Sequence, residues 1–110
     1  KMVVKSGHLK DCGRGRNILI SPKKTGSKNI QMNISIYEPE TVGPELVHAD
    51  SEEVVFFAQG TGTMIIGGEE VKTEPGLVLY VPANIKHTVK NTGKERGILV
   101  CAFSPPTDET

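Results

Sequence analysis

The sequence predicts an all-β protein of a single domain, and three observations support this fold class. The chain has 110 residues, which is enough for one modest hydrophobic core and too few for two. Its 12 glycines and 7 prolines interrupt the chain so often that few stretches could form a long helix. Short apolar segments lie between these interruptions, at spacings of roughly ten residues. This pattern indicates a β-sandwich or closed β-barrel rather than a parallel α/β sheet.

The expected strands follow in chain order. Residues 30–37 carry the clearest signal, because Ile30, Met32, Ile34 and Ile36 alternate with polar residues and so give the strand one dry and one wet face. Gly67 and Gly68 predict a tight hairpin between 63–66 and 69–72, since two consecutive positive φ angles suit glycine. The remaining strands are expected at apolar or turn-bounded segments, namely 54–58, 77–81, 86–91 and 98–103.

One segment allows two interpretations. Residues 45–59 contain no glycine or proline and could form a helix that places His48 and Glu52 four residues apart. The run of Val54, Val55, Phe56 and Phe57 at its end suits a strand better, because β-branched and aromatic residues favour strands. We expect a strand here.

Composition excludes several classes of function. Lysine and arginine number 13 and aspartate and glutamate also 13, so no net positive charge is present to hold a nucleic acid. With three Phe, two Tyr and no Trp, the chain has no aromatic stripe on which bases could stack. No apolar run approaches the ~20 residues of a membrane span, and residues 1–9 lack the apolar core of a signal peptide. Cys12 and Cys101 form no CxxC pair, which indicates a reducing compartment. We expect a cytoplasmic protein without nucleic-acid or membrane partners.

Charge is balanced overall but divided along the chain. Residues 1–30 carry eight of the Lys and Arg residues and one Asp, while residues 31–70 carry eight acidic residues and no basic ones. Either these two patches neutralise one another as solvated faces, or the acidic stretch attracts a cation.

Four residues of two expected β regions could bind a metal ion. A strand through His48 would place Asp50 on the same face, and a turn or bulge could bring Glu53 back to it. His87 follows a turn at residues 82–84. Imidazole and carboxylate groups are ligands that divalent transition metals accept, and two histidines with one carboxylate is the facial arrangement of non-haem iron. The alternative is that these are separate surface groups.

The spacing of these residues resembles the paired motifs of the cupin superfamily. Residues 43–60 read G-x4-H-x-D-x2-E-x6-G, and residues 76–91 read G-x5-P-x-N-x2-H-x3-N. In the second motif Asn84 stands where glycine is usual, a mild change because Asn tolerates a positive φ. The resemblance covers about residues 41–104. It implies a jelly-roll β-barrel (double-stranded β-helix), usually dimeric, that holds one divalent metal through three histidines and one glutamate.

When the ligand positions of the family are matched to this sequence, the resemblance implies that His48, Glu53 and His87 are metal ligands. Asp50 then takes the place of the second histidine. Only two residues separate Asp50 from Glu53, and a slip of one residue would turn its side chain away. Four ligands with two carboxylates favour Mn(II) or Fe(II), with Zn(II) and Ni(II) also allowed. Without Asp50 the two-His-one-carboxylate set remains, and without Glu53 the site would be one that has lost its metal.

Further residues are assigned to the site by strand parity. Val55, Phe57 and Gln59 share the parity of Glu53 and are expected to face the same cavity. Tyr80 and Cys101 lie on apolar strands and either face this substrate pocket or a dimer partner, or serve structural packing alone, which is the expectation we favour. Asp50 or Glu52 is the candidate general base. His8, by contrast, is expected in a solvated loop.

The resemblance also organises the chain. Residues 1–40 are expected to complete the barrel and the dimer interface, residues 41–104 to form the core with both motifs, and residues 105–110 to leave the barrel as a tail. The implied function is that of a metal-dependent enzyme on a small carboxylate or sugar derivative, acting as a dioxygenase, isomerase, lyase or decarboxylase. The alternatives are a non-catalytic module that binds or senses a small molecule, with or without metal, and a structural dimerisation barrel with a filled interior.

Overall fold

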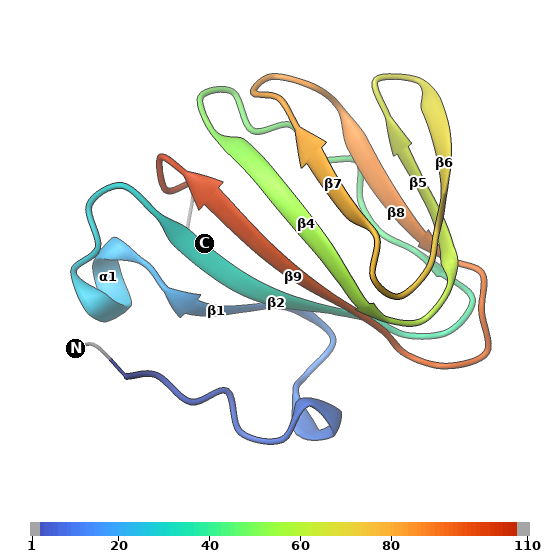
Figure 1. Cartoon of the computed structure of the whole chain (residues 1–110), viewed down its shortest axis with the longest axis horizontal. Helices are drawn as coiled ribbons and strands as arrows, with labels where there is room; N and C mark the ends of the chain where they lie inside the picture. Colours follow the sequence, from blue (N-terminus) through green and yellow to red (C-terminus); the bar gives the residue numbers. More distant parts are fainter. Residues whose placement is uncertain (1–2, 108–110) are drawn as a thin grey trace.

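A computed structural model describes residues 3–107 and places them in two antiparallel β-sheets (Figure 1). The predicted all-β fold class is confirmed, since the helical elements are one short α-helix and one 3₁₀ turn among the described residues. In chain order the elements are η1 (Leu9–Asp11), β1 (Gly15–Ile20), α1 (Pro22–Thr25), β2 (Gln31–Tyr37), β3 (Thr41–Val42), β4 (Glu52–Gln59), β5 (Gly62–Ile66), β6 (Glu69–Thr73), β7 (Val78–Val81), β8 (His87–Asn91) and β9 (Gly97–Ser104).

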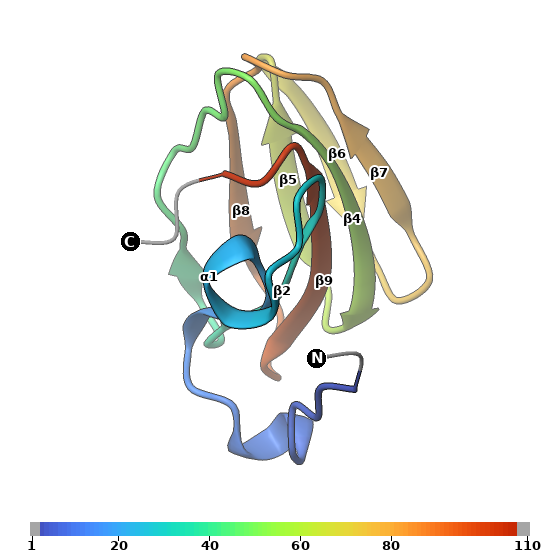
Figure 2. The same ribbon diagram turned by 90° about the vertical axis from the view of Figure 1, so that its left-hand side faces the viewer.

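The two sheets exchange strands along the chain. One sheet has the order β1-β2-β9-β4-β7 and the other the order β3-β8-β5-β6. The chain crosses between sheets after β2, β3, β4, β6, β7 and β8, so that each sheet contains segments far apart in sequence. The views in Figures 1 and 2 place the segment before β1 at the lower edge of the molecule.

Several local predictions are confirmed. Residues 45–59 form no helix; β4 starts at Glu52, and the preceding residues form a loop with a single β-bridge between Leu46 and His87. Gly67 and Gly68 both have positive φ and join β5 to β6 in a two-residue hairpin, where Ile66 pairs with Glu69. Asn84 also has positive φ (64°), as its place in the second motif required.

N-terminal strands were expected within residues 1–40 without bounds for β1, and neither α1 nor β3 was predicted. The capping signals of α1 are nevertheless ordinary: the hydroxyl of Ser21 accepts from the backbone N–H of Lys24, and Pro22 opens the first turn. Gly26, in the left-handed region, ends the helix. No helix of the described residues is long and apolar enough to cross a membrane, and Cys12 and Cys101 are both free thiols.

The main core lies between the two sheets, and β4 shows its parity clearly. Glu53, Val55 and Phe57 are buried, whereas the alternate residues of the same strand are exposed. Val55 and Phe57 pack in one cluster with residues of both sheets, including Met64, Val81, Val89, Leu99, Cys101 and Phe103. The strand thus carries one ionisable residue, Glu53, on its otherwise apolar inner face.

Strand β2 differs from the expectation of one dry and one wet face. Ile34 and Ile36 pack on the outside of the five-stranded sheet, where Ile98, Cys12 and Leu19 complete a second cluster. The polar alternates of β2, with Tyr37 at its end, line a cavity between the sheets. Both faces are covered because the N-terminal segment folds over the outer one.

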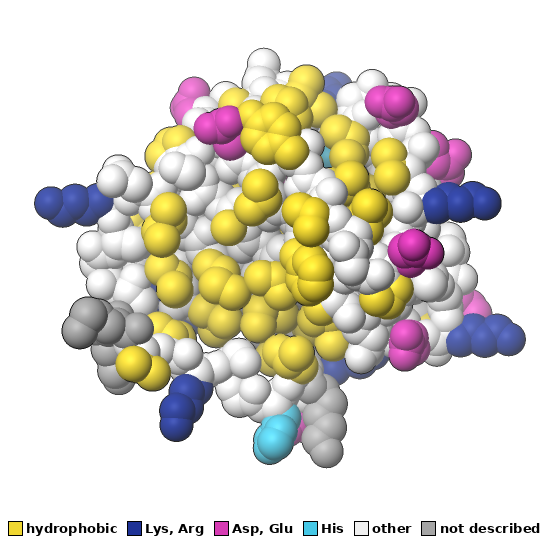
Figure 3. Space-filling model, in the orientation of Figure 1, with side chains coloured by type: hydrophobic (Ala, Val, Ile, Leu, Met, Phe, Trp, Pro, Cys, Tyr) yellow, Lys and Arg dark blue, Asp and Glu magenta, His cyan; other side chains and the backbone are white. Residues whose placement is uncertain are grey.

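The rest of that outer face is apolar and exposed. Val54 pairs with Tyr80, and Phe56 pairs with Val78, across the ladder between β4 and β7. All four side chains are exposed, from 43% for Phe56 to 59% for Val78. Figure 3 shows hydrophobic side chains gathered on this side of the molecule.

Candidate metal centre

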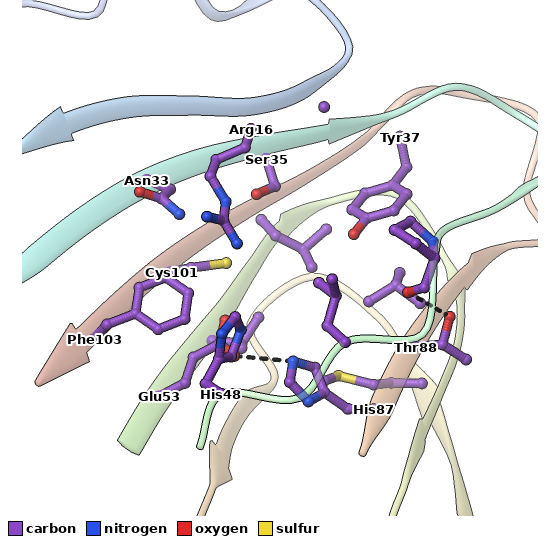
Figure 4. A pocket seen from close by; sticks show the side chains of 17 residues that line it. Arg16, Asn33, Ser35, Tyr37, His48, Glu53, His87, Thr88, Cys101 and Phe103 are labelled. Carbon is purple, nitrogen blue, oxygen red and sulfur yellow. Dashed lines mark hydrogen bonds and ion pairs between the residues drawn. The ribbon is translucent and has the colours of Figure 1, made fainter. Parts of the chain in front are cut away.

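Three ionisable side chains meet inside the barrel (Figure 4): His48 from the loop before β4, Glu53 from β4 and His87 from β8. One ligand atom from each lies within 4.8 Å of the other two. Oε1 of Glu53 is 3.2 Å from Nε2 of His87 and 3.8 Å from Nε2 of His48. Residues separated by up to 39 positions in sequence therefore present an imidazole, a carboxylate and an imidazole to one point.

Strand pairing and hydrogen bonds fix the orientation of the Glu53 and His87 side chains. Glu53 faces inward because of its parity on β4, where it pairs with Phe103 of β9 and Val81 of β7. His87 opens β8, and its main chain exchanges two hydrogen bonds with Leu46, which ties the His48 loop to this strand. Nδ1 of His87 lies 3.0 Å from the carbonyl oxygen of Ile85, which turns Nε2 toward Glu53.

His48 is held at both its backbone and its ring. Its carbonyl oxygen accepts a hydrogen bond from the backbone N–H of Asn84, at 2.8 Å. Its ring packs edge-on against Phe103 and lies 5.2 Å, centroid to centroid, from the ring of His87. Nδ1 lies 3.4 Å from the hydroxyl of Thr107, so that Nε2 faces the cluster.

The surroundings of the two histidines shift their pKa values in opposite directions. Burial lowers the pKa of His48, which keeps its imidazole neutral at neutral pH. Burial acts in the same direction on His87, but the nearby Glu53 carboxylate and the Ile85 carbonyl outweigh it and raise the pKa of His87. His48 is thus ready to donate a lone pair, whereas His87 must first lose any proton it holds.

The three residues fit a divalent cation. Nε2 of His48 is buried and has no hydrogen-bond partner among the described residues, and the buried Oε1 of Glu53 has an ion-pair contact with Nε2 of His87, at 3.2 Å, in place of a well-formed hydrogen bond. A buried polar atom without a partner is costly, so such atoms call for an explanation such as an ion. Two imidazole nitrogens and one carboxylate oxygen are donors that Mn, Fe, Ni and Zn ions accept. The polarity and the convergence of the set both match metal ligation.

A cavity of about 360 Å³ opens from this cluster toward β1 and β2. Its walls combine apolar residues such as Val55, Met64 and Leu99 with polar ones such as Arg16, Asn33 and Tyr37. Burial, with smaller effects of Cys101 and Glu53, raises the pKa of Tyr37 to about 12. Burial also raises the pKa of the Cys101 thiol. Tyr37 and Cys101 therefore face the cavity as neutral groups.

The carboxylates expected beside the metal ligands lie elsewhere. Asp50 is exposed and is not part of the cluster, because residues around it form a loop instead of the expected strand. Glu52 is exposed on the outer face of β4, where its carboxylate accepts a hydrogen bond from the hydroxyl of Tyr80. Neither residue lines the cavity, so the structure does not bring Asp50 to the other three expected ligands, nor either candidate general base to the pocket.

The residues assigned to the pocket by parity divide into two groups. Val55 and Cys101 line the cavity at the cluster. Phe57 and Gln59 also face inward but border a second, smaller hollow, where the Gln59 amide donates to the carbonyl oxygen of Arg96. Tyr80 faces solvent on the outer side of β7. Shared strand parity with Glu53 therefore predicted that Val55, Phe57 and Gln59 face inward, but it did not predict which of the two hollows each residue borders.

Four polar residues of the cavity, Arg16, Asn33, Ser35 and Tyr37, were missed by the sequence patterns. Asn33, Ser35 and Tyr37 lie on one face of the 30–37 strand, which was expected to face water. Their regular alternation with the isoleucines was the sequence signal that could have identified them as one shared face. Arg16 lies two residues before a short apolar run, residues 18–20, between Gly15 and Pro22, which is typical of a strand. Nothing in the sequence alone shows that Arg16 faces the same cavity.

The tail after β9 returns to the barrel. The carbonyl oxygen of Pro105 accepts a hydrogen bond from the Ser51 hydroxyl, and the Thr107 N–H donates to the Gln31 side chain. Residues 105–107 are therefore tied to the loop and strand that flank His48. The remainder of the predicted tail, residues 108–110, lies outside the described residues.

Known structures share this fold. A protein from Thermotoga maritima, described as a predicted oxalate decarboxylase, superposes with a TM-score of 0.78 over 96% of this chain and all (100%) of that one, at 18% identity. The protein KdgF from a Halomonas species superposes with a TM-score of 0.73 over 86% of this chain and 80% of its own, also at 18% identity. At such identities the likeness establishes the fold alone, and it confirms the predicted jelly-roll barrel.

Sequence comparison leads to the same family. The uncharacterized protein MJ1618 of Methanocaldococcus jannaschii is 29% identical over 59 residues, which is 54% of this chain and only 47% of that protein. This chain therefore matches about half the length of that relative. The family model described as "Cupin domain" matches residues 33–103, a range that contains all three residues of the cluster. The chain is a member of the cupin domain family.

Proposed function

We propose that this protein binds one divalent metal ion through His48, Glu53 and His87 and acts as a metal-dependent enzyme on a small polar substrate. The observation that carries this proposal is the convergence of the three ligand atoms within 4.8 Å, two of which have no other polar partner among the described residues. A structural barrel would have a filled interior, whereas here a cavity of about 360 Å³ adjoins the cluster. This volume is at the lower end of the ~300–1,000 Å³ typical of ligand sites.

When bound, the ion supplies Lewis-acid polarisation of a substrate oxygen. The chain supplies the surroundings. Val55, Met64 and Leu99 form apolar walls that exclude water and strengthen the electrostatic interactions inside. The hydroxyl of Tyr37, whose pKa burial raises to about 12, keeps its proton and can donate a hydrogen bond to substrate at any physiological pH.

The cupin fold does not determine which reaction the protein catalyses, so the reaction class has to be assayed. The Thermotoga neighbour is named as a predicted oxalate decarboxylase, so decarboxylation of a small acid belongs among the reactions to assay. Isomerase, lyase and dioxygenase reactions on small carboxylates or sugar derivatives complete the set. A small-molecule ligand, a homodimer and a cytoplasmic location stay predictions.

One observation favours a second candidate, a binding module without catalysis. Glu53 is the sole carboxylate that lines the cavity among the described residues, and as a metal ligand it would not be available as a general base. The same barrel would then retain a small molecule at the metal without converting it. Conversion of any substrate in a metal-dependent assay decides between the two.

Elemental analysis of protein purified without chelator tests the metal centre. We expect one divalent ion per chain in the parent protein and little in the His87→Ala and Glu53→Gln variants. The matched control is His8→Ala, because His8 is exposed and belongs to no ligand cluster among the described residues. Far-UV circular dichroism should show that all variants fold. Equal metal content in His87→Ala and the parent would refute the ligand assignment.

A further inference from the structure

The cavity contains two formally charged side chains among the described residues, Arg16 and Glu53, besides the two histidines. If two neutral imidazoles and one carboxylate bind a divalent ion, that end of the cavity keeps one net positive charge. Arg16, an exposed residue of the cavity lining, adds a second positive charge. A pocket of this sign, bounded by low-dielectric walls, attracts anions.

The fold directs Arg16 toward the cavity. Arg16 lies on the edge strand β1 directly opposite Ser35 of β2, and opposite residues of an antiparallel pair project from the same face. Ser35, like Asn33 and Tyr37, faces the cavity, so Arg16 does so too. Figure 4 shows the guanidinium pointing from β1 toward His48 and Glu53. Arg16 remains exposed because β1 ends the sheet, which places the side chain at the open mouth.

Two neighbours hold the guanidinium in this position. Its Cζ lies 5.8 Å from the centre of the Phe103 ring, within the range of a cation–π contact. With the Asn33 amide oriented so that its oxygen faces β1, that oxygen accepts a hydrogen bond from Nε of Arg16 at 3.2 Å. Asn33 is 1% exposed, so it provides a fixed anchor.

We propose that Arg16 recognises an anionic group of the substrate, so that the cavity selects small carboxylates over neutral sugars or amides of similar shape. This inference rests on the proposed metal-dependent function and names the substrate class of that site. Arginine suits the role because its planar set of N–H donors matches the two oxygens of a carboxylate.

The remaining cavity groups agree with this assignment. Tyr37 and Cys101 stay neutral and place no negative charge beside the ligand. A small acid can therefore place one oxygen toward the metal ligands and its carboxylate toward Arg16.

The test compares glycolate with glycolamide, which have similar shapes but differ in charge. Both are titrated into the zinc-loaded full-length protein and followed by NMR. Replacing Arg16 by Gln should weaken glycolate binding about 10–100-fold, the loss expected for a hydrogen bond between charged groups. Glycolamide binding should change by less than about twofold. Arg16→Lys should recover part of the glycolate affinity, because it restores the charge without the planar donor set.

The matched control is Arg14→Gln, which removes the same charge from an exposed residue that does not line the cavity. It should leave the affinities for both probes unchanged. An equal loss of both probes in Arg16→Gln, or no loss of either, would overturn the inference.

Zinc content, measured on the same samples, separates the two proposals. If Arg16→Gln and the parent both hold zinc but bind glycolate equally well, the anion assignment fails while the metal centre stands. If the parent holds no zinc, the proposed function fails first. Glycolate should also shift the side-chain Nε–H signal of Arg16, identified by its disappearance in Arg16→Lys, whereas glycolamide should not.

Discussion

Replacing Glu53 by Gln is the sharpest perturbation of the metal centre, because it changes charge and basicity with almost no change in shape. Glu53 is 5% exposed, and its Oε1 faces both imidazoles at 3.2 and 3.8 Å. An amide at this position is a poor ligand for a transition-metal ion, whereas the carboxylate is a good one. The variant therefore removes one of three ligands while the barrel keeps its packing.

The expected effect can be expressed as thermal stability. At a metal concentration 100 times the dissociation constant, binding stabilises the native state by about 2.7 kcal/mol. For a domain of this size that corresponds to a rise in Tm of about 10 °C. Loss of an outer partner of a metal ligand weakens affinity about 10–100-fold, so loss of Glu53 itself should weaken it by at least ~100-fold. At the same metal concentration the variant then gains about 0.4 kcal/mol, or roughly 2 °C.

Differential scanning calorimetry with and without Zn(II) or Mn(II) measures these shifts. Glu52→Gln is the matched control, since Glu52 is the adjacent residue of β4 but is exposed on the outer face. It should show the full metal-induced rise. A full rise in Glu53→Gln as well would show that metal binds elsewhere or without this carboxylate.

Three further predictions concern the rest of the fold. Phe57→Ala, at a position 2% exposed, should destabilise the domain by about 3–5 kcal/mol in chemical denaturation, while Phe56→Ala on the outer face should cost less than about 1.5 kcal/mol; equal losses would refute the parity of β4. In alkaline absorbance titration of this Trp-free chain, Tyr80, whose pKa is raised by its hydrogen bond to Glu52, should ionise above pH 10 and Tyr37 near pH 12; one common midpoint at 10 would contradict both environments. The expected homodimer predicts a light-scattering mass twice the 11.9 kDa of one chain, and a monomeric mass at micromolar concentration would reject it.

Much of the fold could be predicted because local signals and tertiary structure agree in the second half of the chain. The Gly67-Gly68 hairpin and the positive φ of Asn84 follow from single residues whose backbone preferences leave little choice. The β1 strand was harder to predict, since Arg16 and Asn17 precede a run of only three apolar residues. Its pairing with β2 depends on the N-terminal segment that covers Ile34 and Ile36, which is a long-range contact with no local signature.

The site shows a similar division. His48, Glu53 and His87 were assigned through the resemblance to the two cupin motifs, and the structure brings these three side chains together. The direction of Asp50 could not be predicted, because it depended on whether residues 46–51 were a strand, and the backbone bonds of Leu46 and Asn84 fix them as a loop instead. Arg16 escaped prediction for another reason: a charged residue at the end of an edge strand is normally solvated, and its neighbours come from β2 and β9.

The energetic cost of Glu53 is itself an argument for a bound cation. Moving a carboxylate from water into a protein interior costs several kcal/mol unless opposite charge compensates it, and the inward neighbours of Glu53 on β4 are Val55 and Phe57. Without a metal ion, this compensation falls to His87, which would have to hold a proton 3.2 Å from the carboxylate, because burial keeps His48 neutral. A valine or leucine here would complete the apolar face and stabilise an empty barrel. The glutamate makes physical sense when a divalent ion faces it, and then both imidazoles are also satisfied as neutral ligands.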